Sequence, residues 1–224
     1  MDNGFNSLLY AARNGHDLCV LELIKAGADP EKQEHQGMTA LLWACTNGHD
    51  RCALALIEAK ANINAAANDG CTALMLSCLN GHEGCSLVLL ENGADVNAVD
   101  AEWTALMYSC QHGLEQCALA VLKAGATIDA TEESGATALL IACQNNHERC
   151  AQALLKAGAA VDAVENKQWT ALMFATQGGH EQCAQELLMA NADPNKAAND
   201  GFTALMLSCQ NGYPEVSCPT QTAT

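Results

Sequence analysis

The tripeptide Thr-Ala-Leu occurs six times in this chain, and successive copies are spaced by 33, 32, 33, 33 and 33 residues. A degenerate copy, Asn6-Ser7-Leu8, lies 33 residues before the first. About ten residues after each copy comes a Gly-His pair or a close variant, as at Gly48-His49. Self-similarity at this period predicts a stack of like supersecondary units, each of which buries its apolar face against its neighbours. The six full copies begin at Thr39, Thr72, Thr104, Thr137, Thr170 and Thr203.

Each unit reads as two short helices followed by a turn. Thr39 is a good N-cap, because its hydroxyl can accept a hydrogen bond from an early helical N–H. The apolar run over residues 40–45 predicts the first helix, and Asn47-Gly48 predicts its end because both residues tolerate left-handed backbone. A second helix is expected over about residues 50–59. The polar stretch that leads to the next Thr-Ala-Leu predicts a turn or a short β-hairpin.

This unit resembles the ankyrin repeat. Its order of Gly-x-Thr-Ala-Leu, Gly-His, Leu-Leu and Gly-Ala-Asp is similar to that family's signature from residue 4 to about residue 213. Alanine replaces the family's proline, as at Ala40, and an apolar residue replaces its histidine, as at Leu42. The resemblance implies an all-α solenoid of six full repeats and a half with short β-hairpin fingers, and protein–protein recognition through a concave groove. The repeats begin near residues 4, 37, 70, 102, 135, 168 and 201, the domain spans residues 1–213, and a tail is expected over residues 214–224.

The formal net charge of −16 argues against binding to nucleic acid, which needs a basic face, and is compatible with a basic partner. Much of the charge has a structural explanation, because an acid opens the second helix of each unit, where the helix dipole favours it. No apolar run approaches the roughly 18 residues that span a bilayer. Met1 precedes Asp-Asn-Gly rather than the basic and apolar segments of a signal peptide. The recurring acids are Asp17, Asp50, Glu83, Glu115, Glu148 and Glu181.

Eleven of the 13 cysteines fall in two columns of the repeat, which also accept Ala, Thr and Val. Such a column selects small apolar side chains, so buried reduced thiols and an intracellular, cytoplasmic location are expected. The alternative is a zinc site, because Cys45, His49 and Cys52 have a spacing that recurs twice. It is the weaker interpretation, because the repeat already accounts for these positions. The recurrences are Cys78, His82 and Cys85, and Cys143, His147 and Cys150; Cys71 and Cys218 lie outside the columns, and Cys218 is the candidate reactive thiol.

Eight of the nine aromatic residues (3 Phe, 3 Tyr and 3 Trp) also lie in two columns. The column within the first helix, which includes Tyr10, Trp43, Tyr108 and Phe174, has a regular apolar spacing that predicts packing between neighbouring helices. The other column immediately precedes the threonine and varies from alanine to tryptophan, which a fixed packing position would not tolerate. Its members are Phe5, Met38, Cys71, Trp103, Ala136, Trp169 and Phe202.

In the resembled family the second column lies on the hairpins that line the concave face, where exposed Trp and Phe side chains would be binding hot spots. Packing of Trp103 and Trp169 over their own turns is an equal alternative, since Glu102 and Gln168 stand where glycine is expected. The predicted partner-binding residues are Met38, Trp103, Trp169 and Phe202, the fingertip residues His35, Gln36, Asn68, Asp69, Glu133, Asn199 and Asp200, and the helix-end residues Thr46, Gln111, Gln144, Gln177 and Gln210.

The function expected from the sequence is therefore that of a scaffold or adaptor that binds a protein or peptide and uses no cofactor. The sequence holds no P-loop, nucleophile elbow or His-Glu-x-x-His motif, so no enzyme class is indicated. Two alternatives stay open. One is a structural subunit of a larger complex, held by its convex face and its uncapped ends, and the other is a thiol- or zinc-binding protein.

Overall fold

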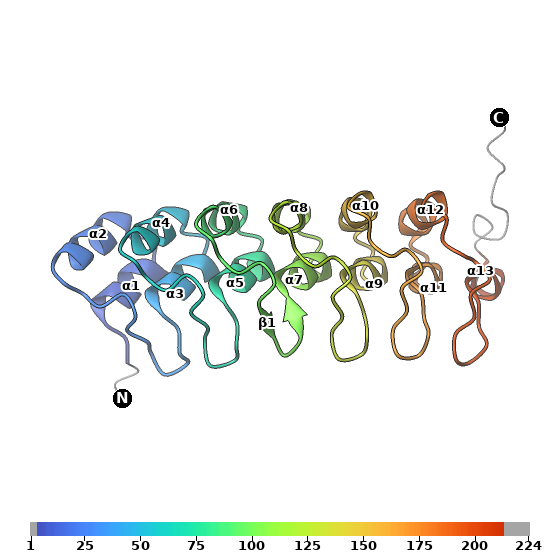
Figure 1. Ribbon diagram of the computed structural model, residues 1–224, viewed down its shortest axis with the longest axis horizontal. Coiled ribbons are helices and arrows are strands. Elements are labelled where there is room, and N and C mark those ends of the chain that lie inside the picture. Colours follow the sequence, from blue (N-terminus) through green and yellow to red (C-terminus); the bar gives the residue numbers. More distant parts are fainter. Residues whose placement is uncertain (1–3, 213–224) are drawn as a thin grey trace. The chain divides into compact units, whose positions relative to one another are not determined.

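The computed structural model describes residues 4–212, and its secondary structure is almost entirely helical (Figure 1). Within these residues the chain forms two compact units, residues 4–108 with 116–126 and residues 109–115 with 127–212. The expected tail, with Cys218, lies outside the described residues. Each unit is described below by itself.

Each repeat contributes a first helix (A helix), a second helix (B helix) and a loop to the next A helix (finger). The A helices are α1 (Ser7–Arg13), α3 (Ala40–Thr46), α5 (Ala73–Asn80), α7 (Ala105–Gln111), α9 (Ala138–Gln144), α11 (Ala171–Gly178) and α13 (Ala204–Asn211). The B helices are α2 (Asp17–Lys25), α4 (Asp50–Glu58), α6 (Glu83–Glu91), α8 (Glu115–Lys123), α10 (Glu148–Lys156) and α12 (Glu181–Met189). The fingers are residues 26–38, 59–71, 92–103, 124–136, 157–169 and 190–202.

The predicted helix boundaries are confirmed by the hydrogen bonds at the helix ends. Thr39 Oγ1 accepts from the Leu42 N–H at 3.3 Å, and Thr170 Oγ1 accepts from the Met173 N–H at 3.2 Å. The B helix of the second repeat ends at Glu58, one residue before the expected end. Lys60 follows with a φ of 67°, so this lysine holds the left-handed conformation that a glycine holds in most other repeats.

Like helices pack on like helices within each unit. In the first unit α1, α3 and α5 form one row and α2, α4 and α6 a second row, with the fingers extending on the side of the A helices (Figure 1). In the second unit α9, α11 and α13 form one row beside α10 and α12 (Figure 1).

The two cysteine columns lie in the core, as expected. Cys45 and Cys143 are 0% exposed, and Cys52 is 1% exposed. The exceptions are Cys19 and Cys209, which are exposed in the first and last repeats, where the described residues include no further repeat to cover them. All twelve cysteines of the described residues are free thiols.

The Gly-His pairs connect successive repeats. His82 Nε2 donates to the Thr46 carbonyl at 3.1 Å, and the ring lies so close to Gly48 that a Cβ there would be 2.6 Å from His82 Nδ1. The same bond joins His49 to the carbonyl of Arg13 at 3.1 Å in the first unit. In the second unit it joins His147 to the carbonyl of Gln111 at 3.0 Å. Histidine therefore has a structural role at this position, where it bonds a repeat to its predecessor. Leu114 replaces it in the fourth repeat.

The fingers are narrow turns that β-bridges close, such as the bridge from Val164 to Thr170. The third finger is one residue shorter and forms a two-stranded hairpin of β1 (Val99–Asp100) and β2 (Trp103–Thr104). Its two turn residues, Ala101 and Glu102, have φ values of 39° and 73°. A two-residue hairpin loop with both φ values positive normally uses Asn and Gly, so this turn is strained.

Candidate partner-binding surface

The two aromatic columns of the sequence contact each other within individual repeats. The ring centroids of Trp103 and Tyr108 lie 5.3 Å apart, and those of Trp169 and Phe174 lie 5.2 Å apart. The first residue of each pair precedes the N-cap threonine and the second is the fourth residue of the helix. This is the spacing of the hydrophobic staple, in which a residue before the cap packs on the first turn and fixes the entry of the chain. The sequence analysis did not recognise these pairs, although their spacing of five residues is visible in the sequence.

The exposure of the predicted anchors differs from finger to finger. Trp103 and Trp169 are half-buried, and Phe202 is 40% exposed. Met38 is only 7% exposed, which contradicts its expected accessibility, because the N–H of Met38 bonds to Glu34 Oε1 at 3.3 Å within its finger and its side chain turns into the core. Accessible aromatic surface is therefore offered by Trp103 in the first unit and by Trp169 and Phe202 in the second.

The aromatic residues of the helix column reach the surface more than expected. Tyr10 is 50% exposed, and Tyr108 and Phe174 are half-buried. The aliphatic members of the same column, such as Ile141 at 4%, are buried as predicted. The prediction of interhelical packing is therefore wrong for Tyr10 and holds for the aliphatic side chains.

Glu165 fixes the finger that carries Trp169. Its Oε1 accepts from the Trp169 N–H at 3.1 Å and from the Lys167 N–H at 2.9 Å. Gln168 completes the turn with a φ of 65°, in a conformation that costs a residue with a side chain about 1–2 kcal/mol. The turn thus keeps its left-handed geometry without glycine, as Glu102 does before Trp103.

The third finger contains a buried carboxylate with two neutral donors. Tyr108 Oη lies 3.0 Å from both carboxylate oxygens of Asp100, and the Cys71 thiol donates to Asp100 Oδ2 at 2.6 Å. Asp100 is 6% exposed. Burial, and then the bond to Asp100, raise the pKa of Cys71 to about 12. Burial and the same carboxylate also raise the pKa of Tyr108.

This network was missed by the sequence analysis, which noted only that Cys71 lies outside the two cysteine columns. Its position is explained by the bond to the carboxylate of the next finger. Because Tyr108 donates to Asp100 and packs against Trp103, the network fixes the position of the Trp103 indole on the third finger.

Several predicted fingertip residues bond to neighbouring fingers. The Asn68 side-chain amide donates to the His35 carbonyl at 2.9 Å, and the Asn68 N–H donates to the Gln36 carbonyl at 2.9 Å. Asn199 makes the equivalent bond to the Asn166 carbonyl at 3.2 Å in the second unit. These two asparagine amides therefore tie fingers together. The exposed fingertip side chains that remain are His35, Gln36, Asp69, Glu133 and Asp200.

The predicted residues at the ends of the A helices also divide into residues bonded within the fold and residues that are exposed. Thr46 Oγ1 donates to the Leu42 carbonyl at 2.8 Å, so the hydroxyl is occupied within its own helix. Gln111 is half-buried, and its carbonyl receives His147. The exposed members of this set are Gln144, Gln177 and Gln210.

An aromatic cluster with an arginine covers the start of the first unit. The guanidinium of Arg13 lies 4.6 Å from the Trp43 ring centroid and 5.7 Å from that of Phe5. Phe5 packs on Trp43 with centroids 5.8 Å apart and on Tyr10 at 4.8 Å. Cation–π contact with Arg13 thus covers the face of Trp43 that would otherwise be open to a partner.

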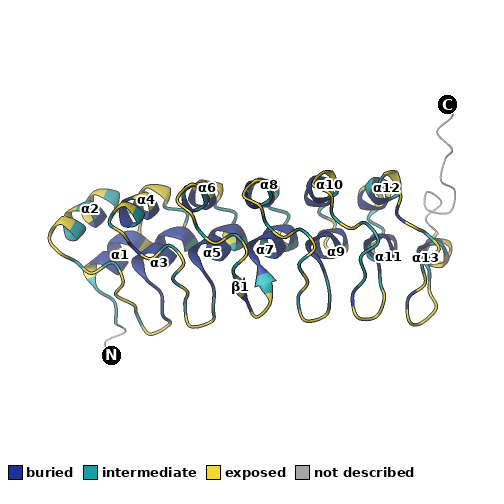
Figure 2. Ribbon diagram, in the orientation of Figure 1, coloured by how far each residue is buried: buried dark blue, intermediate teal, exposed yellow. Residues whose placement is uncertain are grey.

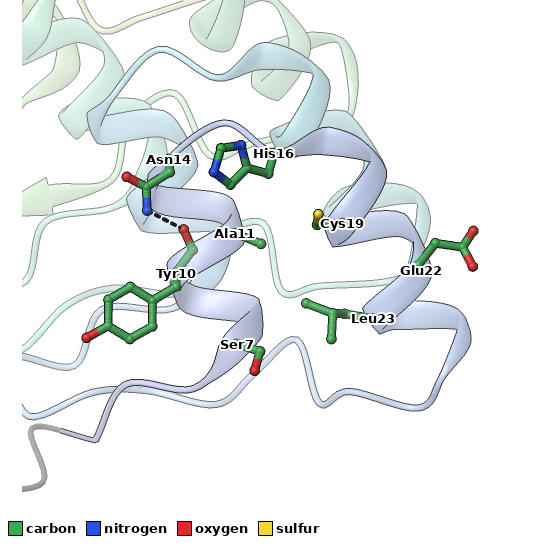
Figure 3. Close-up of a pocket in the computed structure, with 8 residues that line it drawn as sticks. All are labelled: Ser7, Tyr10, Ala11, Asn14, His16, Cys19, Glu22 and Leu23. Atoms are coloured by element: carbon green, nitrogen blue, oxygen red, sulfur yellow. Dashed lines mark hydrogen bonds between the residues drawn. The ribbon is translucent and has the colours of Figure 1, made fainter.

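A pocket of about 630 Å³ lies between α1 and α2 on the outer side of the first repeat (Figure 3). The Asn14 side-chain amide donates to the Tyr10 carbonyl, one turn earlier in the chain, at 2.7 Å (Figure 3). His16 and Cys19 occupy the positions at which His82 and Cys85 contact the preceding repeat. This face of the first repeat therefore carries the same residue types as a contact between repeats. The lining residues are Ser7, Tyr10, Ala11, Asn14, His16, Cys19, Glu22 and Leu23.

The described residues hold no group of three or more His, Cys, Asp or Glu side chains placed to bind a metal ion. Within the same part of the chain, every helix is too short or too polar to cross a lipid bilayer.

Comparison with known proteins agrees with this architecture. Residues 8–100, 99–165 and 157–218 match the family model described as ankyrin repeats (3 copies). The crystal structure of the human ASB11 ankyrin repeat domain is similar at a TM-score of 0.83 and 28% identity, covering 91% of each chain. That of the ankyrin repeat domain of Bcl-3, a member of the IkappaB protein family, has a TM-score of 0.80 and 26% identity, covering 92% of this chain and 94% of the other. No match is found among curated protein sequences.

Proposed function

The chain belongs to the ankyrin repeat family, whose domains are protein–protein interaction modules, and we propose that it is a non-catalytic adaptor that binds a protein or peptide through its finger face. The finger face consists of the fingers and the adjoining surfaces of the A helices in each unit. The observation that carries the proposal is the presentation of Trp103 and Trp169 on strained turns.

Backbone strain directly before each tryptophan supports a binding role for these two fingers. Glu102 and Gln168 occupy left-handed positions where Gly37, Gly70 and Gly135 stand in other repeats. A residue other than glycine destabilises the fold in this conformation, and residues that are nevertheless kept in it concentrate at binding sites. Each one directly precedes a tryptophan, the residue type most enriched in binding hot spots.

The partner is expected to offer apolar side chains flanked by basic ones. Half-buried tryptophans supply apolar area. Exposed carboxylates also lie on the fingers: Glu102 beside Trp103, and Asp69, Glu133 and Asp200 on fingers without a tryptophan. Carboxylates at the rim of an interface steer oppositely charged partners and contribute to specificity. The net charge of −16 is also favourable for binding a basic partner.

A reducing intracellular compartment is the proposed location, the cytoplasm in particular. Twelve free thiols in a small domain are compatible with a compartment that keeps cysteine reduced. The Cys45 and Cys143 thiols carry pKa values well above the ordinary value, because each contacts a neighbouring thiol and is buried, which keeps them protonated and unreactive.

The test is a comparison of two substitutions at one anchor. Partners are first captured from cells with the wild-type chain and identified, and their affinity is then measured with purified proteins. Trp169→Ala removes the anchor, and we expect it to weaken binding by more than about 1 kcal/mol, or roughly fivefold. Trp169→Leu keeps an apolar contact with Phe174 and should preserve the free energy of unfolding while it still weakens binding.

The control is Met189→Gln, which removes a side chain that is 70% exposed on α12, away from the fingers. A large loss of stability with unchanged affinity for the partner in both Trp169 variants would contradict the proposal and leave the indole as a packing residue of its own turn.

A further inference from the structure

The B helices of the first unit carry a row of leucines on their outer faces. Leu54 on α4 is 39% exposed and Leu87 on α6 is 41% exposed, and Leu21 occupies the same position on α2 and is half-buried. α2 packs beside α4, and α4 packs beside α6, so the three side chains share one surface. This leucine row lies on helices whose outward sides are exposed and which are on the side of the unit away from the fingers (Figure 2).

The second unit shows that the repeat does not need leucine at this position. Gln152 on α10 and Gln185 on α12 are the equivalent residues. The Gln152 side-chain amide donates to Glu186 Oε1 at 2.9 Å, so a polar side chain is well accommodated on the same helix face. Stacking of the repeats therefore does not explain why the first unit places an apolar side chain there in successive repeats.

Carboxylates flank Leu54 and Leu87 on both sides. On α4, Asp50 and Glu58 are exposed four residues before and four residues after Leu54. On α6, Glu83 and Glu91 hold the same positions around Leu87 and are also exposed. The one cation on these two helices is Arg51, whose Nη1 lies 4.0 Å from Asp17 Oδ2 on α2. The surface is thus an apolar row with acidic margins on α4 and α6. On α2 the position after the row is Lys25, which pairs with Glu22 Oε1 at 2.7 Å.

We propose that the leucine row binds a basic amphipathic α-helix of a partner protein, which lies across α2, α4 and α6. Packed helices are spaced by about 8–10 Å, and seven residues of an α-helix advance about 10 Å. A helix with apolar side chains at every seventh position therefore meets Leu21, Leu54 and Leu87 in turn. Lys or Arg side chains on either side of that apolar edge face the carboxylates of α4 and α6, which also disfavour an anionic membrane as the occupant.

This interaction is independent of the proposed finger face, because it uses the B helices and no residue of the fingers. It gives the chain a second binding surface, so that one partner on the fingers and another on the leucine row could be held by the same molecule. Failure of either interaction leaves the other unaffected.

The test uses a synthetic helical peptide of about 20 residues with leucine at every seventh position and lysine beside it, and a second peptide of the same composition in scrambled order. Fluorescence anisotropy of the labelled peptide measures binding to the full chain. We expect the heptad peptide to bind with a Kd in the micromolar range and more weakly at high ionic strength. The double variant Leu54→Gln, Leu87→Gln, which installs the residue of the second unit, should weaken binding at least tenfold with an unchanged circular dichroism spectrum.

Met189→Gln and Trp169→Leu are the matched controls, and both should bind the heptad peptide as the wild type does. Equal binding of the scrambled peptide, or unchanged binding by the double leucine variant, would overturn the proposal. Sedimentation with vesicles of phosphatidylcholine and phosphatidylserine provides the other decisive comparison. Leucine-dependent binding to the vesicles and not to the heptad peptide would mean that the row faces a membrane, and it would equally overturn the proposal.

Discussion

The hydroxyl of Tyr108 donates to Asp100, with its oxygen 3.0 Å from each of the two carboxylate oxygens. Tyr108→Phe removes this donor and leaves a buried carboxylate with the Cys71 thiol as its remaining side-chain donor. Because hydrogen bonds to charged groups contribute more than neutral ones, we expect the free energy of unfolding to fall by about 1–3 kcal/mol. Urea unfolding followed by tryptophan fluorescence measures the change.

Tyr10→Phe is the control for that experiment, because Tyr10 occupies the same column and is 50% exposed. Its substitution should change the stability by no more than about 0.5 kcal/mol. Equal effects of the two substitutions would show that Asp100 draws no stability from the Tyr108 hydroxyl.

Cys71 gives a prediction for the dependence of stability on pH. Its pKa is raised to about 12 in the folded chain, first by burial and then by the bond to Asp100, against about 8.5 for an unfolded cysteine. The folded chain therefore binds the thiol proton more tightly, so this contribution is complete below pH 8.5 and is lost as the pH rises toward 12. The stability difference between the wild type and Cys71→Ala should shrink between about pH 8 and pH 10. A difference that stays constant over this range would contradict it.

Two glycine substitutions separate the steric clash with the histidine of the next repeat from the free-energy cost of left-handed backbone. Gly48 and Gly27 have φ values of 74° and 87°, so alanine is strained at both, by about 1–2 kcal/mol. At Gly27 nothing lies within 4 Å of an added Cβ, whereas at Gly48 the His82 ring does. Gly48→Ala should therefore lower the melting temperature clearly more than Gly27→Ala. Equal losses would mean that the ring moves aside without losing its bond to the Thr46 carbonyl.

The strained turns predict stabilising substitutions. Replacing Gln168 by glycine relieves about 1–2 kcal/mol of left-handed strain and adds about 0.5–1 kcal/mol of chain entropy cost. We expect Gln168→Gly to raise the free energy of unfolding by about 0.5–1 kcal/mol. Lys60→Gly, which lies at the end of a B helix, should do the same. If glycine destabilises position 168 and stabilises position 60, the Gln168 side chain makes a stabilising contact that offsets its strain.

The features that were predictable from the sequence depend on local periodicity. The threonine caps and the burial of the cysteine columns follow from residues within one unit. The repeat length follows from the spacing of seven similar units. Left-handed backbone at Lys60 and Gln168 followed from the same alignment, because a glycine stands at those positions in other repeats.

The features that were missed depend on contacts that break the repeat. Asp100 of the third finger bonds to Cys71 of the preceding finger. The third finger is one residue shorter than the others, and no other repeat provides a template for that register. Met38 was expected on the surface because its column varies in size, but variation in a column does not reveal which of its members turn inward. The aromatic staples lay within reach of sequence reasoning, since their spacing is a local rule of helix starts.

The contact between Gly48 and His82 bears on how a chain of this kind can change its length. Gly15 and the Arg13 carbonyl present to His49 the same contact that Gly48 and the Thr46 carbonyl present to His82, at an offset of 33 residues. If one 33-residue segment is lost or duplicated, the repeats that become neighbours still offer each other the same glycine, carbonyl and histidine. Whole repeats can therefore be removed or added in a lineage without a new interface between repeats. The third finger lacks this freedom, because Asp100 needs a thiol from the finger before it and a phenol from the A helix that follows it. Gain and loss of repeats should therefore occur on either side of the segment from Cys71 to Tyr108, which would be inherited as one piece.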